Sequence, residues 1–184
     1  MRKNFGAQTH LYPMPVFIIG TYDEDGTPNA MNAAWGGTAN SNQIAICIDL
    51  SHKTFKNILL RKAFTVSMAT ANYVKECDYV GLVSGDKIPD KLAKAGFTTE
   101  KSEYVDAPII NELPMTLECK LVKVLEEELV IGEIVNVSAD ESVLKDGKID
   151  PAKLQPITYD PINHKYIKLG EVVGNAFSDG KSLM

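Results

Sequence analysis

Cysteine and long apolar runs are both scarce in this sequence. Its three cysteines, Cys47, Cys77 and Cys119, are too widely spaced for a CxxC pair or a disulfide framework. This usage favours a reducing compartment, so we expect a cytoplasmic protein. No run approaches the roughly 20 apolar residues that a membrane span requires, and the first residues form no signal-peptide stretch. We therefore expect no membrane association.

Positive charge is in deficit. Lysine and arginine together number 19, against 24 aspartates and glutamates, so the formal net charge is −5 and the pI is about 5.2. Such a surface repels phosphate backbones, and we expect no nucleic-acid partner. A single phosphate group can still bind, because local amides and one or two cations decide that contact.

The common nucleotide and hydrolase motifs are missing. The sequence has no GxGxxG after a strand, no GxxxxGKS or GxxxxGKT, and no GxSxG. Their absence excludes the Rossmann, P-loop and nucleophile-elbow arrangements. The three histidines, His10, His52 and His164, show no HExxH or paired-ligand spacing. We expect no metal site and assign no catalytic side chain.

Length and composition are those of an ordinary globular chain. Hydrophobic residues make up 45% of the 184 and charged residues 23%, which suits a single buried core, so we expect one domain spanning 1–184. β-Branched and aromatic runs predict strands at 16–22, 29–40, 43–50, 63–69, 115–125, 129–139 and 166–169. Apolar spacing predicts helices over 73–83 and 89–95, and a third helix with Phe55, Ile58 and Leu59 on one face and Ser51 as its N-cap.

Short turns join most of these strands. Asp25-Gly26 suits the tight turn of a first hairpin, and residues 126–128 connect two long strands as an antiparallel pair. Asp146-Gly147 and Asp150-Pro151 predict turns in the tail. Connections this short leave no room for helical crossovers. The order of elements therefore predicts a mainly β fold, an antiparallel barrel with appended helices rather than a doubly wound sheet.

The segment 32–38, Asn-Ala-Ala-Trp-Gly-Gly-Thr, consists of small residues around one large aromatic side chain. Small residues let a flat ligand approach the backbone. An isoalloxazine ring needs backbone donors and acceptors beside an apolar or aromatic wall, which this segment could supply. The same residues also suit a packed internal strand with Trp35 in the core, and the segment by itself favours that second interpretation.

Residues 49–54, Asp-Leu-Ser-His-Lys-Thr, run from a strand end into a helix start. The free amides of a helix N-terminus, the hydroxyls of Ser51 and Thr54 and the cation of Lys53 together form an anion site. A serine N-cap followed by a surface lysine explains the same residues without a ligand. Taken together, the two segments predict a mononucleotide site, with ring contacts on the strand and phosphate contacts at the helix.

Motifs along nearly the whole chain resemble one family. They lie at 13–16 (PMPV), 25–37 (DGTPNAMNAAWGG), 53–54 with 57–58, 64–67 (FTVS), 78–81 (DYVG), 84–85, 90–91, 107–110 (APII), 117–119, 132–135 (GEIV), and in the tail at Tyr166, Leu169-Gly170, Gly174, Ala176-Phe177 and Gly180-Lys181. In these motifs the chain resembles flavin reductase-like proteins of the flavoredoxin type. That resemblance implies an antiparallel split β-barrel that binds FMN and forms a homodimer, with the flavin in a groove near the subunit interface.

The resemblance also implies a set of cofactor-binding residues. Those expected to line the isoalloxazine are Asn32, Ala33, Ala34, Trp35 and Thr38. Those expected at the ribityl-phosphate end are Asp49, Ser51 and Thr54, to which the charge argument adds Lys53. Ser84 and Tyr166 are expected to close the groove.

Two segments depart from the family pattern. Residues 40–43, Asn-Ser-Asn-Gln, stand where many relatives carry a Pro-Pro pair before the third strand. Residues 126–129, Glu-Glu-Glu-Leu, stand where many carry a Gly-x-His turn. No histidine is therefore available there to assist nicotinamide binding, which weakens the case for NAD(P)H as the direct donor.

The resemblance implies an FMN-dependent oxidoreductase that accepts electrons or hydride, for instance from NAD(P)H, and passes them to a second acceptor. The cofactor carries that chemistry, so no acid or base side chain is required. Two alternatives stay open. One is a flavoredoxin-like electron carrier whose acidic surface docks to protein redox partners. The other is a non-redox module that uses the barrel for another ligand.

Overall fold

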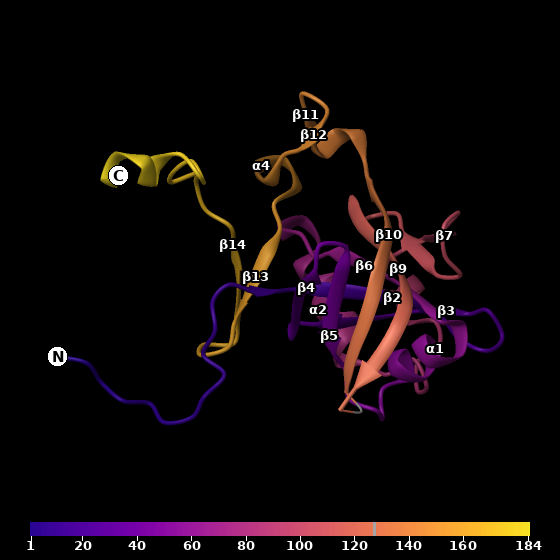
Figure 1. The fold of residues 1–184 in the computed structure, drawn as a ribbon. Helices are drawn as coiled ribbons and strands as arrows, with labels where there is room; N and C mark the ends of the chain where they lie inside the picture. Colours follow the sequence, from indigo (N-terminus) through magenta and orange to yellow (C-terminus); the bar gives the residue numbers. More distant parts are fainter. Residues whose placement is uncertain (127) are drawn as a thin grey trace.

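The computed structural model describes residues 1–126 and 128–184. Its main feature is one antiparallel sheet of seven strands in the order β3-β2-β6-β9-β10-β5-β4. The strands are β2 (Phe17–Tyr22), β3 (Pro28–Ala33), β4 (Gly36–Asn40), β5 (Gln43–Cys47), β6 (Ala63–Met68), β9 (Met115–Leu125) and β10 (Leu129–Ala139). The sheet curls into an open barrel (Figure 1). The prediction of a mainly β, antiparallel fold is confirmed.

The two edge strands of the open barrel, β3 and β4, follow each other in the chain. The single strand predicted over 29–40 is wrong, because β3 ends at Ala33 and β4 begins at Gly36. β3 pairs with β2 and β4 pairs with β5, at opposite edges of the sheet. Ala34 and Trp35 therefore cross from one edge to the other, and the Trp35 carbonyl accepts from the Cys47 amide at 2.8 Å. One straight strand could not reach both edges.

The two longest strands, β9 and β10, are confirmed as an antiparallel pair of 11 residues each. Of the three glutamates that connect them, Glu127 lies outside the described residues. The register shifts between Ile131 and Gly132. A Cβ added at Gly132 would overlap the ring of Phe64, which is fully buried. The glycine is therefore what lets β10 pass over that ring.

Strand β2 is buried on both of its faces. Ile19 packs inside the barrel with Ile46 and Phe64. Ile18, the neighbouring residue, packs on the outer face with Val80 of α2. Successive side chains of a strand point to opposite faces, so β2 separates the barrel core from a second core under the helices.

The α-helices of the described chain are α1 (Lys53–Arg61), α2 (Val74–Leu82), α3 (Lys91–Ala95) and α4 (Pro151–Leu154). Ser51 was predicted to cap α1, and this is wrong: the N-cap is His52, whose side chain makes no cap bond. The Ser51 amide instead donates to Asp49 Oδ1 at 2.7 Å. That side-chain bond forms a turn one residue earlier, which moves Ser51 out of the cap position.

Smaller sheets complete the structure. They are β1 (Met14–Pro15) with β13 (Ile157–Asp160) and β14 (Lys165–Lys168), β7 (Thr99–Lys101) with β8 (Pro108–Ile110), and β11 (Leu144–Lys145) with β12 (Lys148–Ile149). The 3₁₀ helices are η1 (Ala71–Tyr73), η2 (Glu141–Val143) and η3 (Asp179–Leu183).

Both ends of the chain extend away from the body, on the side of β13 and β14 (Figure 1). Within the described residues, no helix has the length and apolar character needed to cross a membrane.

Candidate functional site

Three adjoining cavities follow the chain from the start of α1 to the break between β3 and β4. The first, of about 280 Å³, lies between the start of α1 and the end of α2. The second, of about 400 Å³, shares Asn32, Gly81 and Leu82 with the first. The third, of about 350 Å³, shares Ala34 with the second. We call these three adjoining cavities the groove; it lies beside both segments that the sequence analysis singled out.

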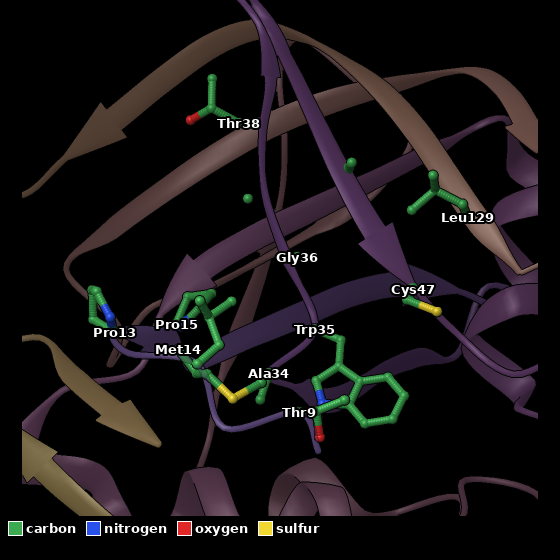
Figure 2. A pocket seen from close by; sticks show the side chains of 13 residues that line it. Thr9, Pro13, Met14, Pro15, Ala34, Trp35, Gly36, Thr38, Cys47 and Leu129 are labelled. Carbon is green, nitrogen blue, oxygen red and sulfur yellow. The ribbon is translucent and has the colours of Figure 1, made fainter. Parts of the chain in front are cut away.

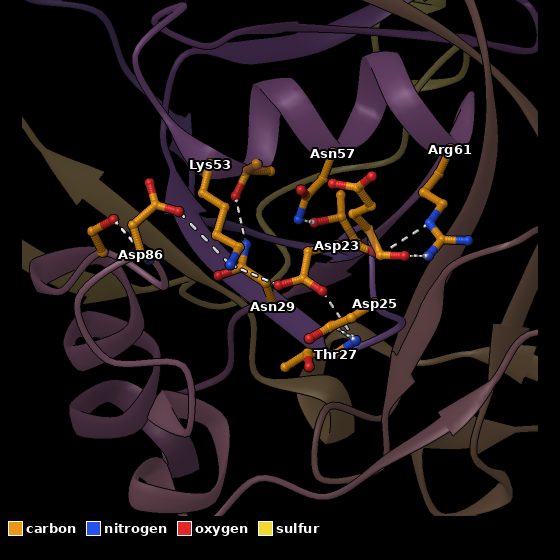
Figure 3. Close-up of polar contacts among 12 residues, drawn as sticks. Asp23, Asp25, Thr27, Asn29, Lys53, Asn57, Arg61 and Asp86 are labelled. Carbon is orange, nitrogen blue, oxygen red and sulfur yellow. Dashed lines mark hydrogen bonds and ion pairs between the residues drawn. The ribbon is translucent and has the colours of Figure 1, made fainter.

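Lys53 lines the first cavity, but its charge is shared (Figure 3). Its Nζ lies 2.6 Å from Asp23 Oδ2 and 3.7 Å from Asp86 Oδ1. The hydrogen bond to Asp23 raises the pKa of Lys53, so the ammonium stays charged. The two carboxylates offset much of the positive field that a lone lysine would give to this end of the groove.

Thr54 and Asn29 form a buried pair in the same cavity. Thr54 is 2% exposed, and its Oγ1 accepts from Asn29 Nδ2 at 2.9 Å. Asn29 is 3% exposed, and its Oδ1 has no hydrogen-bond partner in the part of the chain that the structure describes. A Cβ at Gly85 would overlap this oxygen, so glycine is required where the chain after α2 approaches it. Buried acceptors in folded proteins are almost always satisfied, so a ligand hydroxyl or amide suits this position.

Lys91, like Asn29, lines this cavity and was missed by the sequence analysis. It is 3% exposed, and its Nζ donates to the carbonyls of Val80 and Val83, both at 3.0 Å. These carbonyls belong to the C-terminal end of α2, where a cation is favourable. Burial and the nearby Lys53 lower the pKa of Lys91 to about 8. The only sequence signal was its position in the 90–91 family motif, which says nothing about burial.

The second cavity contains a tyrosine–carboxylate contact. The Tyr166 hydroxyl donates to Asp78 Oδ1 at 2.7 Å, and Asn32 Nδ2 donates to the Cys77 carbonyl at 3.1 Å and to the Tyr166 hydroxyl at 3.4 Å. Burial, followed by the bond to Asp78, raises the pKa of Tyr166. Tyr159 and His164 also line this cavity, and their Oη and Nδ1 share a hydrogen bond of 2.7 Å. The hairpin β13–β14 thus supplies a polar wall opposite α2.

The third cavity is lined by the crossing segment and the N-terminal residues (Figure 2). Ala34, Trp35 and Thr38 line it together with Leu11 and Pro13. Trp35 is 56% exposed. The interpretation that Trp35 belongs to the core is therefore wrong, because the residue lies where the chain crosses between sheet edges, outside the core clusters of the described residues.

Comparison with known proteins identifies the family. Residues 9–164 match the flavin reductase like domain. The chain belongs to this family. Family membership supports a flavin-binding redox function.

Solved structures of the flavin reductase like family agree with this fold. Flavoredoxin of Desulfovibrio vulgaris (Miyazaki F) aligns with a TM-score of 0.95 and 42% identity, over 98% of this chain and 100% of that one. Flavoredoxin from Methanosarcina acetivorans gives 0.89 and 30%, over 100% of both chains. An FMN-binding domain from Shewanella baltica gives 0.78 and 22%, over 88% of both chains, and supports the fold alone. The resemblance to flavoredoxins and the split-barrel fold are confirmed.

Most of the predicted site residues line the groove of this flavin reductase like chain. Those that line its three cavities are Asn32, Ala34, Trp35, Thr38, Lys53, Thr54, Ser84 and Tyr166. Ala33, Asp49 and Ser51 line none of the three. The Ala33 side chain packs in the barrel core instead, and Asp49 and Ser51 bond to each other in an exposed turn.

The histidine, cysteine and carboxylate side chains of the described residues do not gather into a metal site in this family member. Among them, no group of three histidine, cysteine, aspartate or glutamate side chains could hold a metal ion. Cys77 and Cys119 are buried, and burial raises the pKa of each thiol to about 12. Both therefore stay protonated at neutral pH and act as small apolar side chains.

Proposed function

We propose that this chain binds FMN in the groove and moves reducing equivalents through it to a second acceptor. The main support is the buried polar end of the groove. There Asn29 Oδ1 has no donor among the described residues, and Lys53, Thr54 and Lys91 line the same cavity. A buried acceptor with the Lys91 cation nearby, beside the ion-paired Lys53, suits a polyhydroxyl chain that ends in a phosphate.

Each end of the nucleotide would then have its own contacts. Residues that would hold the phosphate are Lys53, Thr54, Ser84 and Lys91. Asn29 Oδ1 would accept a hydrogen bond from a ribityl hydroxyl. Residues that would line the ring are Asn32, Ala34 and Tyr166, with Trp35 and Thr38 beyond them. Ala33 would contribute only backbone, and Asp49 and Ser51 would support the turn before α1 without touching the ligand.

When bound, FMN would supply the redox chemistry, since a flavin ring accepts two electrons and can release them singly or in pairs. The protein would orient the ring and fix the protonation of the groups around it. Tyr166, with its raised pKa, stays protonated at neutral pH. Its single proton is engaged by Asp78, so towards a ligand it offers an acceptor oxygen and an aromatic surface.

As electron donor we propose NAD(P)H, as the family resemblance implies, or a protein redox partner. The electron-carrier alternative is supported by the net charge of −5, which favours docking to basic redox proteins. Binding of another ligand without redox chemistry is the third candidate. We also propose a homodimer, one domain over 1–184, and a cytoplasmic location, which rests on cysteine usage alone.

The absorption spectrum of the purified protein tests the cofactor. A yellow protein that releases a chromophore with the mass of FMN supports the proposal. A colourless protein that shows no saturable FMN titration contradicts it and favours the non-redox module.

Stopped-flow mixing separates the two redox candidates. FMN-loaded protein is mixed anaerobically with NADH or NADPH while the flavin absorbance is followed. Bleaching within seconds is the result expected of a reductase. If neither nucleotide bleaches the flavin but a reduced protein partner does, the chain is a carrier.

Two single variants test the phosphate end. Thr54→Val removes a buried hydroxyl in the groove, and we expect FMN affinity to fall about tenfold or more. Ser51→Ala changes a residue in the exposed turn and should leave affinity within about twofold. Fluorescence titration measures both. Unchanged affinity in Thr54→Val would mean that the phosphate lies elsewhere.

A further inference from the structure

The accessible surface of the chain is larger than that of a compact monomer of the same mass. Its accessible surface is 11354 Å², whereas a compact monomer of 20.2 kDa exposes roughly 8,700 Å². The excess is therefore roughly 2,600 Å², slightly above the area, on the order of 1,000 to 2,500 Å², that each partner hides in a large obligate dimer. An excess of this size is enough for the interface of a dimer of two copies of this chain.

Part of this excess lies in residues 169–184, which we name the C-terminal arm. Leu169 donates to the Pro156 carbonyl at 3.3 Å, and the arm's later hydrogen bonds among the described residues are internal. Val173 is 100% exposed and Phe177 98% exposed. The arm still folds locally, since the Asn175 amide donates to Asp179 Oδ2 at 2.8 Å. Large apolar side chains that a locally ordered segment exposes to solvent are typical of a surface that packs against another protein surface.

The same chain carries a surface of matching character. The third cavity, of about 350 Å³, is lined mainly by apolar residues, among them Leu11, Met14 and Trp35. Leu11 is 64% exposed and Trp35 56%. A cavity of this size admits a phenylalanine or valine side chain. Arm and cavity both occur on every copy, so two copies can cover each other with twofold symmetry, which closes the assembly.

Charge does not oppose this pairing. The arm carries Glu171, Asp179 and Lys181 as its charged side chains, so its formal charge is close to zero. It can therefore approach an acidic second copy without strong repulsion. A basic or strongly acidic partner protein would find no complementary charge on the arm.

We propose that the C-terminal arm of each copy crosses to a second copy and seats Val173 and Phe177 against the Trp35 cavity. This rests on the homodimer of the proposed function and names the surface that forms it. This cavity adjoins the second cavity of the groove at Ala34. The arm of the second copy thus forms one wall of the groove beside Trp35, and a single chain has an incomplete site.

Sedimentation velocity tests the arm. Val173→Asp with Phe177→Asp adds two negative charges at side chains that are almost fully exposed, so the monomer should keep its fold. We expect a wild-type dimer and self-association weakened by about 30-fold or more per side chain in the double variant. Lys181→Glu makes the same change of charge in the arm without altering its apolar side chains. It should remain a dimer.

Trp35 reports on the proposed seat, because it is the single tryptophan of the chain. Acrylamide quenching of its emission, at matched flavin load, should rise about twofold in the double variant, since the arm no longer covers it. A monomeric wild type, a double variant that is still dimeric, or a monomeric variant with unchanged quenching would each overturn the proposal. Flavin absorbance is read in the same samples: a yellow monomer refutes only the arm, and a colourless dimer refutes only FMN binding.

Discussion

Lys91 is the side chain whose environment has the clearest chemical consequence. Its ammonium is buried, holds the end of α2 through Val80 and Val83, and lines the cavity proposed for the phosphate. A substitution there should affect both the fold and the ligand. The two effects separate when FMN is compared with riboflavin, because riboflavin lacks the phosphate.

Lys91→Met should lower FMN affinity by about tenfold or more and change riboflavin affinity by less than about threefold. It should also lower the free energy of unfolding by about 1 to 3 kcal/mol, because the two α2 carbonyls lose a charged donor. Lys56→Met removes the same charge from an exposed position on α1 and serves as the control. Fluorescence titration and urea unfolding measure the two effects. Equal losses for FMN and riboflavin would exclude a phosphate contact.

The lowered pKa of Lys91 predicts a pH dependence of FMN binding. Free protein loses this proton near pH 8, earlier than an ordinary lysine. A bound phosphate raises the pKa back towards its usual value, so the complex holds more protons than the free protein above about pH 8. Affinity should therefore fall as the pH rises from about 8 to about 10. Asp86 and Lys53 also act on Lys91, but the raised pKa of Lys53 keeps that group charged across this window.

Titrations at about pH 7 and about pH 9.5 test this, with an expected loss of about tenfold. Lys91→Met should show a flat profile over the same range. An equal decline in the variant would assign the pH dependence to another group.

Among the elements, β10 depends most clearly on a single position. Gly132 lies beside the register shift and over the buried ring of Phe64. Gly132→Ala should therefore lower the free energy of unfolding by about 1 to 3 kcal/mol through overpacking. Gly170→Ala, where a Cβ meets no atom within 4 Å, should change it by less than about 0.5 kcal/mol. Urea unfolding compares the two, and equal stability of both variants would show that Phe64 moves aside freely.

Elements with a strong local pattern were predictable, and those defined by distant partners were not. The alternation and length of 115–125 and 129–139 predicted β9 and β10 correctly. The run 29–40 looked like one strand because the residues on both sides of Ala34 favour extended backbone. Its division follows from the two sheet edges that β3 and β4 join. β1 was missed because its partner β13 lies more than a hundred residues away in the sequence, which leaves no local signal.

For the whole molecule, the net charge of −5 predicts that, if the chain is a carrier, its electron transfer to a basic protein depends on ionic strength. Reduction of a basic cytochrome by the FMN-loaded, reduced protein should slow by about tenfold or more between low and high salt. Reduction of a neutral quinone should be insensitive to salt. Stopped-flow rates at several ionic strengths measure both. Equal salt dependence for the two acceptors would exclude electrostatic docking.

The sequence by itself determined the β class and the long hairpin, because these depend on side-chain alternation and turn residues, and most of the site residues that its motifs predicted line the groove. Only the tertiary structure decided that Trp35 is exposed, that Ala33 turns into the core, and that Lys91 lies buried beside Lys53 and Thr54. Exposure and proximity depend on which elements pack together, and here α1, α2 and α3 meet over β3 from separate parts of the chain. No local sequence pattern predicts that these three helices pack over the same strand.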